Sequence, residues 1–328
     1  MPGDTPIKLV TIGGGTGLST LLEGLKSYIN PPEQKISLTA IVTVTDDGKS
    51  SGRLRGEFSV LPPGDIRSCL VALAEEDHVM TRLFRHRYPG DGALGGHSLG
   101  NLIILALNQM SGDFLAAVDQ ARKMLGINAR VLPSTLDCVD LVARINGRAV
   151  CGQVAIKSQN APIEELSLTP AFARALPAAI DAILRADYIT LGPGSLFTSV
   201  IATLLVKEIS LALAESRAKK VYICNAMTEA DETHGFSAVD HVRQLLAYAP
   251  KLRLDYALFN SAPISSEMRE RYAAENAFAL EPPEYVPSDL KGIQFLSAPL
   301  ASESRFVRHD PGKLSRTILE VYSHGSRQ

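Results

Sequence analysis

The sequence predicts an α/β protein built on a doubly wound, mostly parallel sheet with helices on both faces. Short apolar, β-branched runs alternate along the chain with stretches whose apolar residues recur every three or four positions. Several of these runs also end in polar, glycine-bearing loops, and doubly wound sheets bind their ligands beyond the carboxyl ends of the strands. We therefore expect the loops GGGTG, TDDGKSSGR, GPGSLFTS and CNAMTE to converge on one crevice.

The first predicted strand and helix enclose the glycine loop. Leu9 to Ile12 has the character of a buried strand, and the leucines from Leu18 to Leu25 form the stripe of an amphipathic helix. Free N–H groups and the positive end of the helix dipole would meet at the turn, which favours a phosphate held by Gly14, Gly15, Thr16 and Gly17. Leu18 stands where the dinucleotide motif has its third glycine, and no Lys-Ser/Thr pair follows, so neither standard phosphate motif is complete. A tight turn without a ligand is the alternative.

The second predicted strand, residues 36 to 44, ends in a cluster of charged side chains. Asp46 and Asp47 suit ribose hydroxyls or Mg²⁺, whereas a plain turn before Gly48 is the alternative interpretation. The residues that follow have hydroxyl and guanidinium groups that suit phosphate oxygens: Ser50, Ser51, Arg53 and Arg55.

Two apolar helices come next. PPGDIRSCLVALA predicts a helix with Asp65 as its N-cap. In GGHSLGNLIILALNQM, the spacing of His97 and Asn101 places both on one helical face, where they would serve as acid/base or orienting groups. Helix capping or a buried hydrogen bond is the alternative for this histidine.

A small β insertion is expected at about residues 130 to 170, because Asn146-Gly147 between two short alternating runs is a strong hairpin signal. The strand-loop-helix pattern then returns with GPGSLFTS. Its N–H groups and three hydroxyls suit a diphosphate, with Gly192, Gly194 and Ser195 in the turn. KKVYICNAMTE predicts a further buried strand. Asp310 and Pro311 predict the start of the last helix.

Composition excludes several classes of protein. With 328 residues, 45% hydrophobic and 21% charged, one large or two medium globular domains would fit. No long linker divides the chain, and a single domain over 1–328 is expected. The net charge of -2 and a pI near 6.4 argue against nucleic acid as a partner. No secretory signal, membrane span, zinc motif or catalytic triad is evident, so we expect a cytoplasmic protein with no membrane insertion, no metal ligands and no catalytic residues.

Seven segments in this order resemble one family: GGGTGLSTLLEGLK, AIVTVTDDGKSSGRLR, PPGDIRSCLVALA, GGHSLGN, LGPGSLFTS, VYICNAMTE and VRHD. Together they are similar to the bacterial gluconeogenesis factors (YvcK-like), which belong with the 2-phospho-L-lactate transferases in the CofD-like superfamily. The resemblance extends from about Lys8 to Asp310 and implies a Rossmann-like fold with a nucleotide crevice.

The resemblance also implies a function. Gluconeogenesis factors bind UDP-sugars such as UDP-N-acetylglucosamine and regulate carbon metabolism, cell shape and cell-wall synthesis, so protein partners in those processes are expected, with no cofactor required. A homodimer is the default assembly. By motif, the crevice would be lined by Gly14, Gly15, Thr16, Asp46, Asp47, Ser51, Arg53, Asn101, Gly194, Ser195 and Asn225. Tyr272 and Arg308 resemble nucleotide-sugar positions of the same group.

Two departures and two alternatives accompany this resemblance. Relatives usually have glycine at the position of Lys49, and some have threonine at the position of Pro311. The first alternative function is a transferase that uses a guanine nucleotide with Mg²⁺ at Asp46 and Asp47. The second is a dinucleotide-dependent oxidoreductase, which the incomplete glycine motif disfavours.

Overall fold

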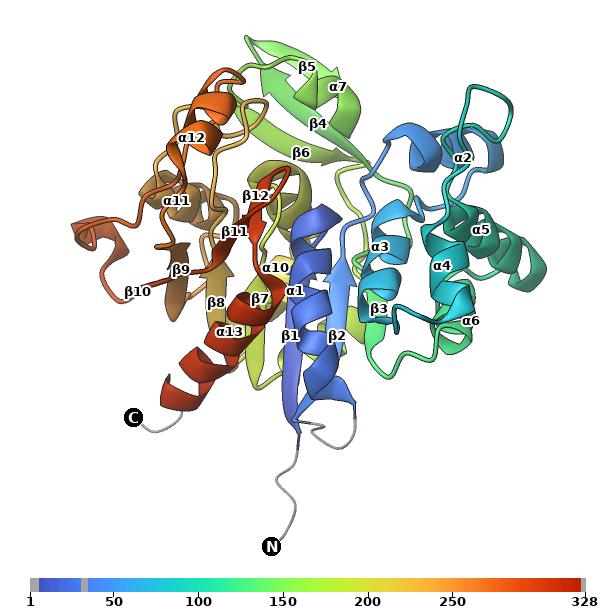
Figure 1. The fold of residues 1–328 in the computed structure, drawn as a ribbon, viewed down its shortest axis with the longest axis horizontal. Helices are drawn as coiled ribbons and strands as arrows, with labels where there is room; N and C mark the ends of the chain where they lie inside the picture. The colour runs from blue at the N-terminus through green and yellow to red at the C-terminus, as the bar shows by residue number, and fades with distance from the viewer. Residues whose placement is uncertain (1–5, 31–34, 326–328) are drawn as a thin grey trace, which may run out of the picture.

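The fold is that of a parallel sheet with helices on both faces (Figure 1). The structure is a computed structural model and describes residues 6–30 and 35–325. All seven strands of the main sheet are parallel to their neighbours. They are β1 (Ile7–Gly13), β2 (Ile36–Val42), β3 (Arg130–Pro133), β7 (Tyr188–Leu191), β8 (Lys219–Ile223), β9 (Tyr256–Asn260) and β10 (Gln294–Ala298). The predicted fold class is confirmed.

The order of the strands fixes where a ligand site can form. Across the sheet the order is β3-β2-β1-β7-β8-β9-β10, so the winding reverses between β1 and β7. At such a switch point the loops after the two central strands diverge to opposite faces and leave a crevice. The glycine loop follows β1 and the GPGS loop follows β7, which places both at this crevice.

Helices cover the two faces of the sheet. Figure 1 shows α1 and α13 in front of the central strands and α10 behind them. The helices are α1 (Gly15–Ile29), α2 (Lys49–Phe58), α3 (Gly64–Leu73), α4 (Val79–Arg85), α5 (Leu99–Ser111), α6 (Phe114–Met124), α7 (Gln153–Lys157), α8 (Pro177–Leu184), α9 (Ala202–Leu204), α10 (Lys207–Glu215), α11 (Ala238–Tyr248), α12 (Ser266–Ala273) and α13 (Pro311–Gly325). A π-helix, η1 (Leu196–Ile201), precedes α9, and a 3-10 turn, η2 (Ser288–Leu290), follows α12.

The central strands contain few polar residues because most of their side chains lie in the core. β1 and β2 are covered on both faces, so Leu9, Ile12 and Ile41 are fully buried. The leucines of the predicted α1 stripe, Leu18 to Leu25, are fully buried as well. The periodicity of the sequence thus predicted these two strands and this helix correctly.

The β insertion is smaller than expected. It consists of β4 (Asp140–Ile145), β5 (Arg148–Cys151) and β6 (Glu165–Thr169), with α7 between the last two. Asn146 and Gly147 both have positive φ, 50° and 72°, as the hairpin signal requires. Residues 130–133, which we assigned to the insertion, are instead β3 of the main sheet, because their apolar side chains pack beside β2. The insertion lies over the edge where the central strands end (Figure 1).

Three further local expectations have different outcomes. Asp310 caps α13 by accepting the Lys313 N–H at 2.9 Å, and Pro311 is its first residue, as predicted. α3 begins at Gly64 with Pro63 as its cap residue, so the assignment of Asp65 as N-cap is wrong. α5 begins at Leu99, so His97 precedes the helix and does not share a helical face with Asn101.

A short antiparallel pair, β11 (Ala301–Glu303) and β12 (Val307–His309), precedes α13. Within the described residues, no single helix is long and apolar enough to cross a membrane, although Leu196–Leu204 and Lys207–Glu215 meet that test as a bent pair. The segment MPGDT, on which the expectation of no secretory signal partly depends, lies outside the described residues.

Candidate functional site

The glycine loop connects β1 to α1 with the close packing that only glycine permits. Gly15 has φ of 61°, a left-handed conformation that other residues rarely adopt. A Cβ on Gly17 would lie 2.7 Å from the Gly194 backbone, so the two glycine loops touch. The first-turn N–H of Gly15 donates to the Asp65 carboxylate at 2.9 Å, whereas the N–H groups of Thr16 and Gly17 have no acceptor among the described residues.

A cavity of about 250 Å³ opens at the switch point between the two loops. We call it the first cavity. Its lining combines both glycine loops, the loop after β8 and the segment at β12. The predicted site residues that line it are Gly14, Gly15, Thr16, Gly17, Gly194, Ser195, Asn225, Tyr272 and Arg308.

The wall opposite the glycine loop comes from the far end of the sequence. The Tyr272 hydroxyl of α12 accepts the Val307 N–H at 3.0 Å, which fixes β12 beside α12. Arg308 lies over the Phe306 ring, 5.3 Å from its centroid, and lines the cavity. Arg271 and Arg305 lie over the same ring but do not line the cavity, so one of these three guanidinium groups contributes to this wall.

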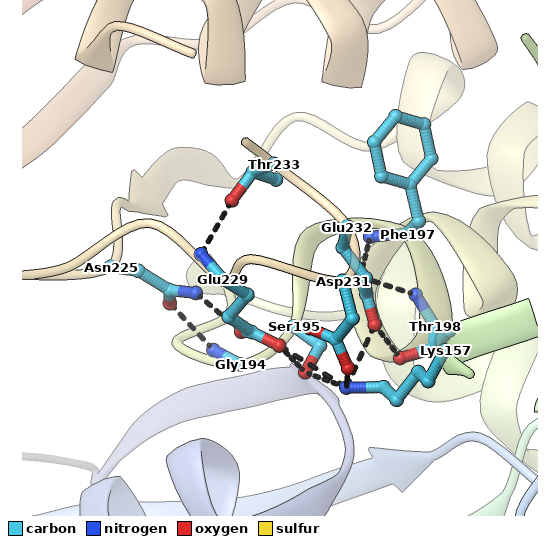
Figure 2. Close-up of polar contacts among 10 residues, drawn as sticks. All are labelled: Lys157, Gly194, Ser195, Phe197, Thr198, Asn225, Glu229, Asp231, Glu232 and Thr233. Atoms are coloured by element: carbon cyan, nitrogen blue, oxygen red, sulfur yellow. Dashed lines mark hydrogen bonds and ion pairs between the residues drawn. The ribbon is translucent and has the colours of Figure 1, made fainter. Parts of the chain in front are cut away.

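An ion cluster holds the loops after β7 and β8 in place (Figure 2). Lys157 belongs to α7 of the insertion. Its Nζ lies 3.2 Å from a carboxylate oxygen of Glu229, 3.6 Å from one of Asp231 and 3.0 Å from one of Glu232. Burial lowers the pKa of Lys157, but Glu232, Glu229 and Asp231 outweigh it and raise the pKa well above its ordinary value. Lys157 is therefore a cation at physiological pH and connects the insertion to the site.

Glu232 occupies the helix terminus that we expected to bind a diphosphate. Its fully buried carboxylate accepts the Phe197 N–H at 3.0 Å, the Thr198 N–H at 3.2 Å and the Thr198 hydroxyl (Figure 2). Thr198 supplies one of the three hydroxyls that we expected to bind a diphosphate. Its hydroxyl and the N–H groups of Phe197 and Thr198 are therefore not free for phosphate. Ser199 lines the first cavity, while the Ser195 hydroxyl donates to Glu229 at 2.7 Å.

A second group of predicted residues surrounds a different cavity of about 450 Å³, which we call the second cavity. Asp46, Ser51 and Asn101 line it, so the loop TDDGKSSGR borders a cavity beside the one that the other three loops share. TDDGKSSGR is also not wholly a loop, because α2 begins at Lys49. Asp65 separates the two cavities: it lines the second cavity and binds the Gly15 N–H of the first. Burial and the nearby Asp46 raise the pKa of Asp65 to about 7.

His97 and Asn101 meet at a hydroxyl although they share no helical face. Ser50 Oγ lies 3.0 Å from His97 Nδ1 and 3.0 Å from Asn101 Nδ2, and Arg67 Nε donates to Asn101 Oδ1 at 3.0 Å. Burial and Arg53 lower the pKa of His97, so its imidazole is neutral at pH 7. The alternative interpretation of His97, a buried hydrogen-bonded group, is the one that its geometry supports.

Three predicted site residues have other partners. Asp47 accepts the Val154 N–H of the insertion at 2.9 Å, and Arg53 donates to the carbonyls of Ala93 and Gly95. Gly192 precedes a cis peptide bond to Pro193 and does not line the first cavity. Asp46 accepts the Gly48 N–H at 3.0 Å, so Asp46 and Asp47 bind different segments and do not form the carboxylate pair proposed for Mg²⁺. Within residues 6–30 and 35–325, no three His, Cys, Asp or Glu side chains form a metal cluster.

Comparison with known proteins identifies the family. Residues 9–300 match the family of the 2-phospho-L-lactate transferase CofD. The chain belongs to the CofD family. Within it, the chain is 40% identical over 314 residues to the gluconeogenesis factor of Halalkalibacterium halodurans, covering 95% of each protein. It is also 40% identical over 318 residues to that of Bacillus subtilis, covering 96% of this chain and 98% of the relative.

The fold of this chain agrees with that of a crystal structure from the same family. A protein of Bacillus halodurans superposes with a TM-score of 0.90 at 39% identity, covering 96% of this chain and 100% of the other. The gluconeogenesis-factor resemblance predicted from the seven motifs is thereby confirmed. The match also includes the regions that supply Asp65, Lys157, Glu229 and Glu232 to the site.

Sequence reasoning missed the acidic members of this CofD-family site. Glu229 is the last residue of the predicted loop CNAMTE, and Glu232 lies three residues further on. Their position after the carboxyl end of β8 was the available signal. Lys157 gave no such signal, because it lies in the insertion and reaches the cluster only through tertiary structure.

Proposed function

We propose that this CofD-family protein binds a nucleotide sugar of the UDP-N-acetylglucosamine type in its first cavity and acts through that binding as a regulator. One observation carries the proposal. The N–H groups of Thr16 and Gly17 have no acceptor among the described residues, and Arg308 lines the opposite wall of the same cavity. Helix N-termini and guanidinium groups are the two protein elements that best bind phosphate oxygens.

The distribution of polar groups supports a diphosphate with a flanking sugar or base. The glycine loop contributes backbone donors, while Asn225 and Tyr272 add an amide and an aromatic ring with a hydroxyl at the rim. Asn225 is oriented, because its Oδ1 accepts the Gly194 N–H at 3.3 Å and its Nδ2 donates to Glu229 at 3.0 Å. Lys157 offsets the negative charge that Glu229 brings to this cavity.

The relatives' name supports the regulatory part of the proposal. Proteins 40% identical to this chain are called gluconeogenesis factors, and that name denotes an effect on carbon metabolism. The expected roles in cell shape and cell-wall synthesis, through protein partners, are part of this proposal. Such a role needs saturable ligand binding and no turnover.

The test is isothermal titration with UDP-N-acetylglucosamine, with GDP and NAD as comparison ligands, each with and without Mg²⁺. We expect one-site binding of the UDP-sugar, weakened about tenfold or more by Arg308→Ala because a charge-assisted contact to phosphate is lost. Arg305→Ala is the matched control, because it removes the same charge from the same ring but not from the cavity wall.

Two outcomes would count against this function. Equal affinity of the wild type and Arg308→Ala would place the ligand elsewhere. Tighter binding of GDP, dependent on Mg²⁺ and accompanied by product formation with a phosphate-bearing substrate, would favour the transferase activity that names the family.

A further inference from the structure

The second cavity has features that the nucleotide-sugar proposal does not use. α2 and α3 both begin at it, and neither cap residue, Gly48 or Pro63, provides a side-chain hydrogen bond. In the described chain, the first-turn N–H groups of Ser50, Ser51 and Gly64 have no acceptor. Two helix dipoles therefore direct their positive ends at one space, which favours an anion.

Cationic side chains surround the same space. Lys49, Arg67 and Arg87 line the cavity, against the carboxyl groups of Asp46 and Asp65. Burial, followed by the nearby Arg87, lowers the pKa of Arg67, and Asp65 and Asp46 offset part of this effect. An anion between the two guanidinium groups would offset the repulsion between them.

Hydrogen bonds hold the guanidinium groups of Arg67 and Arg87 in position, and both groups still have N–H donors without a partner among the described residues. Arg67 donates to Asn101, to Ser68 at 2.8 Å and to the Phe84 carbonyl at 3.5 Å, and Arg87 donates to the Gly96 carbonyl at 2.6 Å. Each guanidinium has five N–H donors, so both keep donors for a ligand. Such fixed donors bind tetrahedral or planar anions with little loss of side-chain entropy.

A buried hydroxyl completes the site. The side chain of Ser51 is 3% exposed and lines the cavity beside Asp46, and its hydroxyl makes no hydrogen bond to the described residues. A hydroxyl at a cavity wall without a protein partner is available to donate a hydrogen bond to a ligand.

We propose that the second cavity binds a small phosphorylated metabolite, with its phosphate between Arg67, Arg87 and the N-termini of α2 and α3. A phosphate monoester fits because it accepts several hydrogen bonds from helix N–H groups, guanidinium groups and a hydroxyl at once. The site is separate from the nucleotide-sugar site and does not depend on it. The protein would thus combine two ligands on either side of Asp65.

The test uses inorganic phosphate as the probe, titrated at constant ionic strength and followed by calorimetry and ³¹P NMR. We expect Arg87→Gln to weaken phosphate binding about tenfold and Ser51→Ala about three- to tenfold. Arg82→Gln is the matched control, because Arg82 is exposed on the neighbouring helix α4 and does not line the cavity. Thermal unfolding of each variant confirms that it is folded.

Two further variants locate the phosphate and identify its charge partner. Arg308→Ala should leave phosphate binding within twofold of the wild type, because Arg308 belongs to the first cavity. Asp46→Asn should tighten binding, because it removes a negative charge from the second cavity. Weaker binding in Asp46→Asn would mean that a cation mediates the interaction and would overturn the proposal.

Three other results would also overturn it. The first is the absence of saturable binding up to about 10 mM phosphate. The second is wild-type affinity in both Arg87→Gln and Ser51→Ala. The third is loss of phosphate binding in Arg308→Ala with no change in Arg87→Gln, which would assign the phosphate to the first cavity.

Discussion

The N-terminus of η1 and the N-termini of α2 and α3 all lie near the carboxyl ends of the central strands, but their N–H groups have different partners. At η1, the buried carboxylate of Glu232 accepts two N–H groups and a hydroxyl. At α2 and α3, the first-turn N–H groups of Ser50, Ser51 and Gly64 face a cavity without a protein acceptor in the described chain. The same backbone geometry thus gives a closed site in one place and an open one in the other.

This difference shows what a glycine-rich or hydroxyl-rich turn can and cannot predict. The turn creates positive potential at a helix N-terminus, but a carboxylate from elsewhere in the chain can satisfy it first. Glu232 lies 34 residues after Thr198 in the sequence. Whether the site is open is therefore decided by tertiary contacts, and the variants below test that conclusion.

The largest expected effect is at Glu232. Glu232→Ala leaves two buried N–H groups and a hydroxyl without their acceptor and removes one partner of Lys157. We expect a loss of about 3 kcal/mol or more in the free energy of unfolding. Chemical denaturation measures it, with Asp231→Asn as the control.

Asp231 is partly exposed and lies 3.6 Å from the same lysine, so Asp231→Asn should cost less than about 1 kcal/mol. Similar losses in the two variants would show that Glu232 acts only as a partner of Lys157 and that it is not the acceptor that closes the helix terminus.

A smaller effect is expected where the two glycine loops touch. The Cβ of Gly17→Ala would lie 2.7 Å from backbone atoms of Pro193 and Gly194, which cannot move independently. We expect a loss of about 1–3 kcal/mol, measured by thermal unfolding. Gly56→Ala in α2, with no atom within 4 Å of its Cβ, should be neutral or slightly stabilising. Equal unfolding temperatures would mean that the loops separate easily.

The smallest expected effect is a pH dependence at Asp65, between the two cavities. Its folded pKa of about 7 exceeds the ordinary value of 3.8, so the folded state holds a proton that the unfolded state has lost. This contribution to stability is present below pH 3.8 and is lost as pH rises toward 7. Asp65→Asn keeps an acceptor for the Gly15 N–H but removes the titration.

The stability of Asp65→Asn relative to the wild type should therefore increase by about 1–2 kcal/mol between pH 5.5 and pH 8.5. Unfolding curves of both proteins at the two pH values give this difference, and groups common to both cancel. A constant difference would mean that Asp65 is ionised throughout this range.

Local sequence patterns predicted most of the fold because the forces involved are local. The leucine stripe of α1, the Asn146-Gly147 turn and the cap at Asp310 each depend on neighbours within a few residues. The first cavity was also largely predictable, because parallel strands bring the loops after β1, β7 and β8 to one edge. Its Tyr272 and Arg308 wall was found only through the family resemblance.

The errors concern interactions between distant segments. Asp65 has the residue type of an N-cap, but it lies two residues after the cap residue Pro63 and binds the glycine loop 50 residues away. Asp47 binds the insertion through Val154, 107 residues away. Neither partner can be identified from spacing, because the packing of whole elements brings them together.

The first cavity joins parts of the chain that are separated by nearly all of the described sequence. The glycine loop at residues 14–17 faces Val307 and Arg308, so a fragment that lacks either segment has an incomplete site. Bringing such distant segments together costs loop-closure entropy, which slows folding. A ligand that bridges the two walls of this cavity would therefore bind only chains in which both ends of the described sequence have reached their native positions.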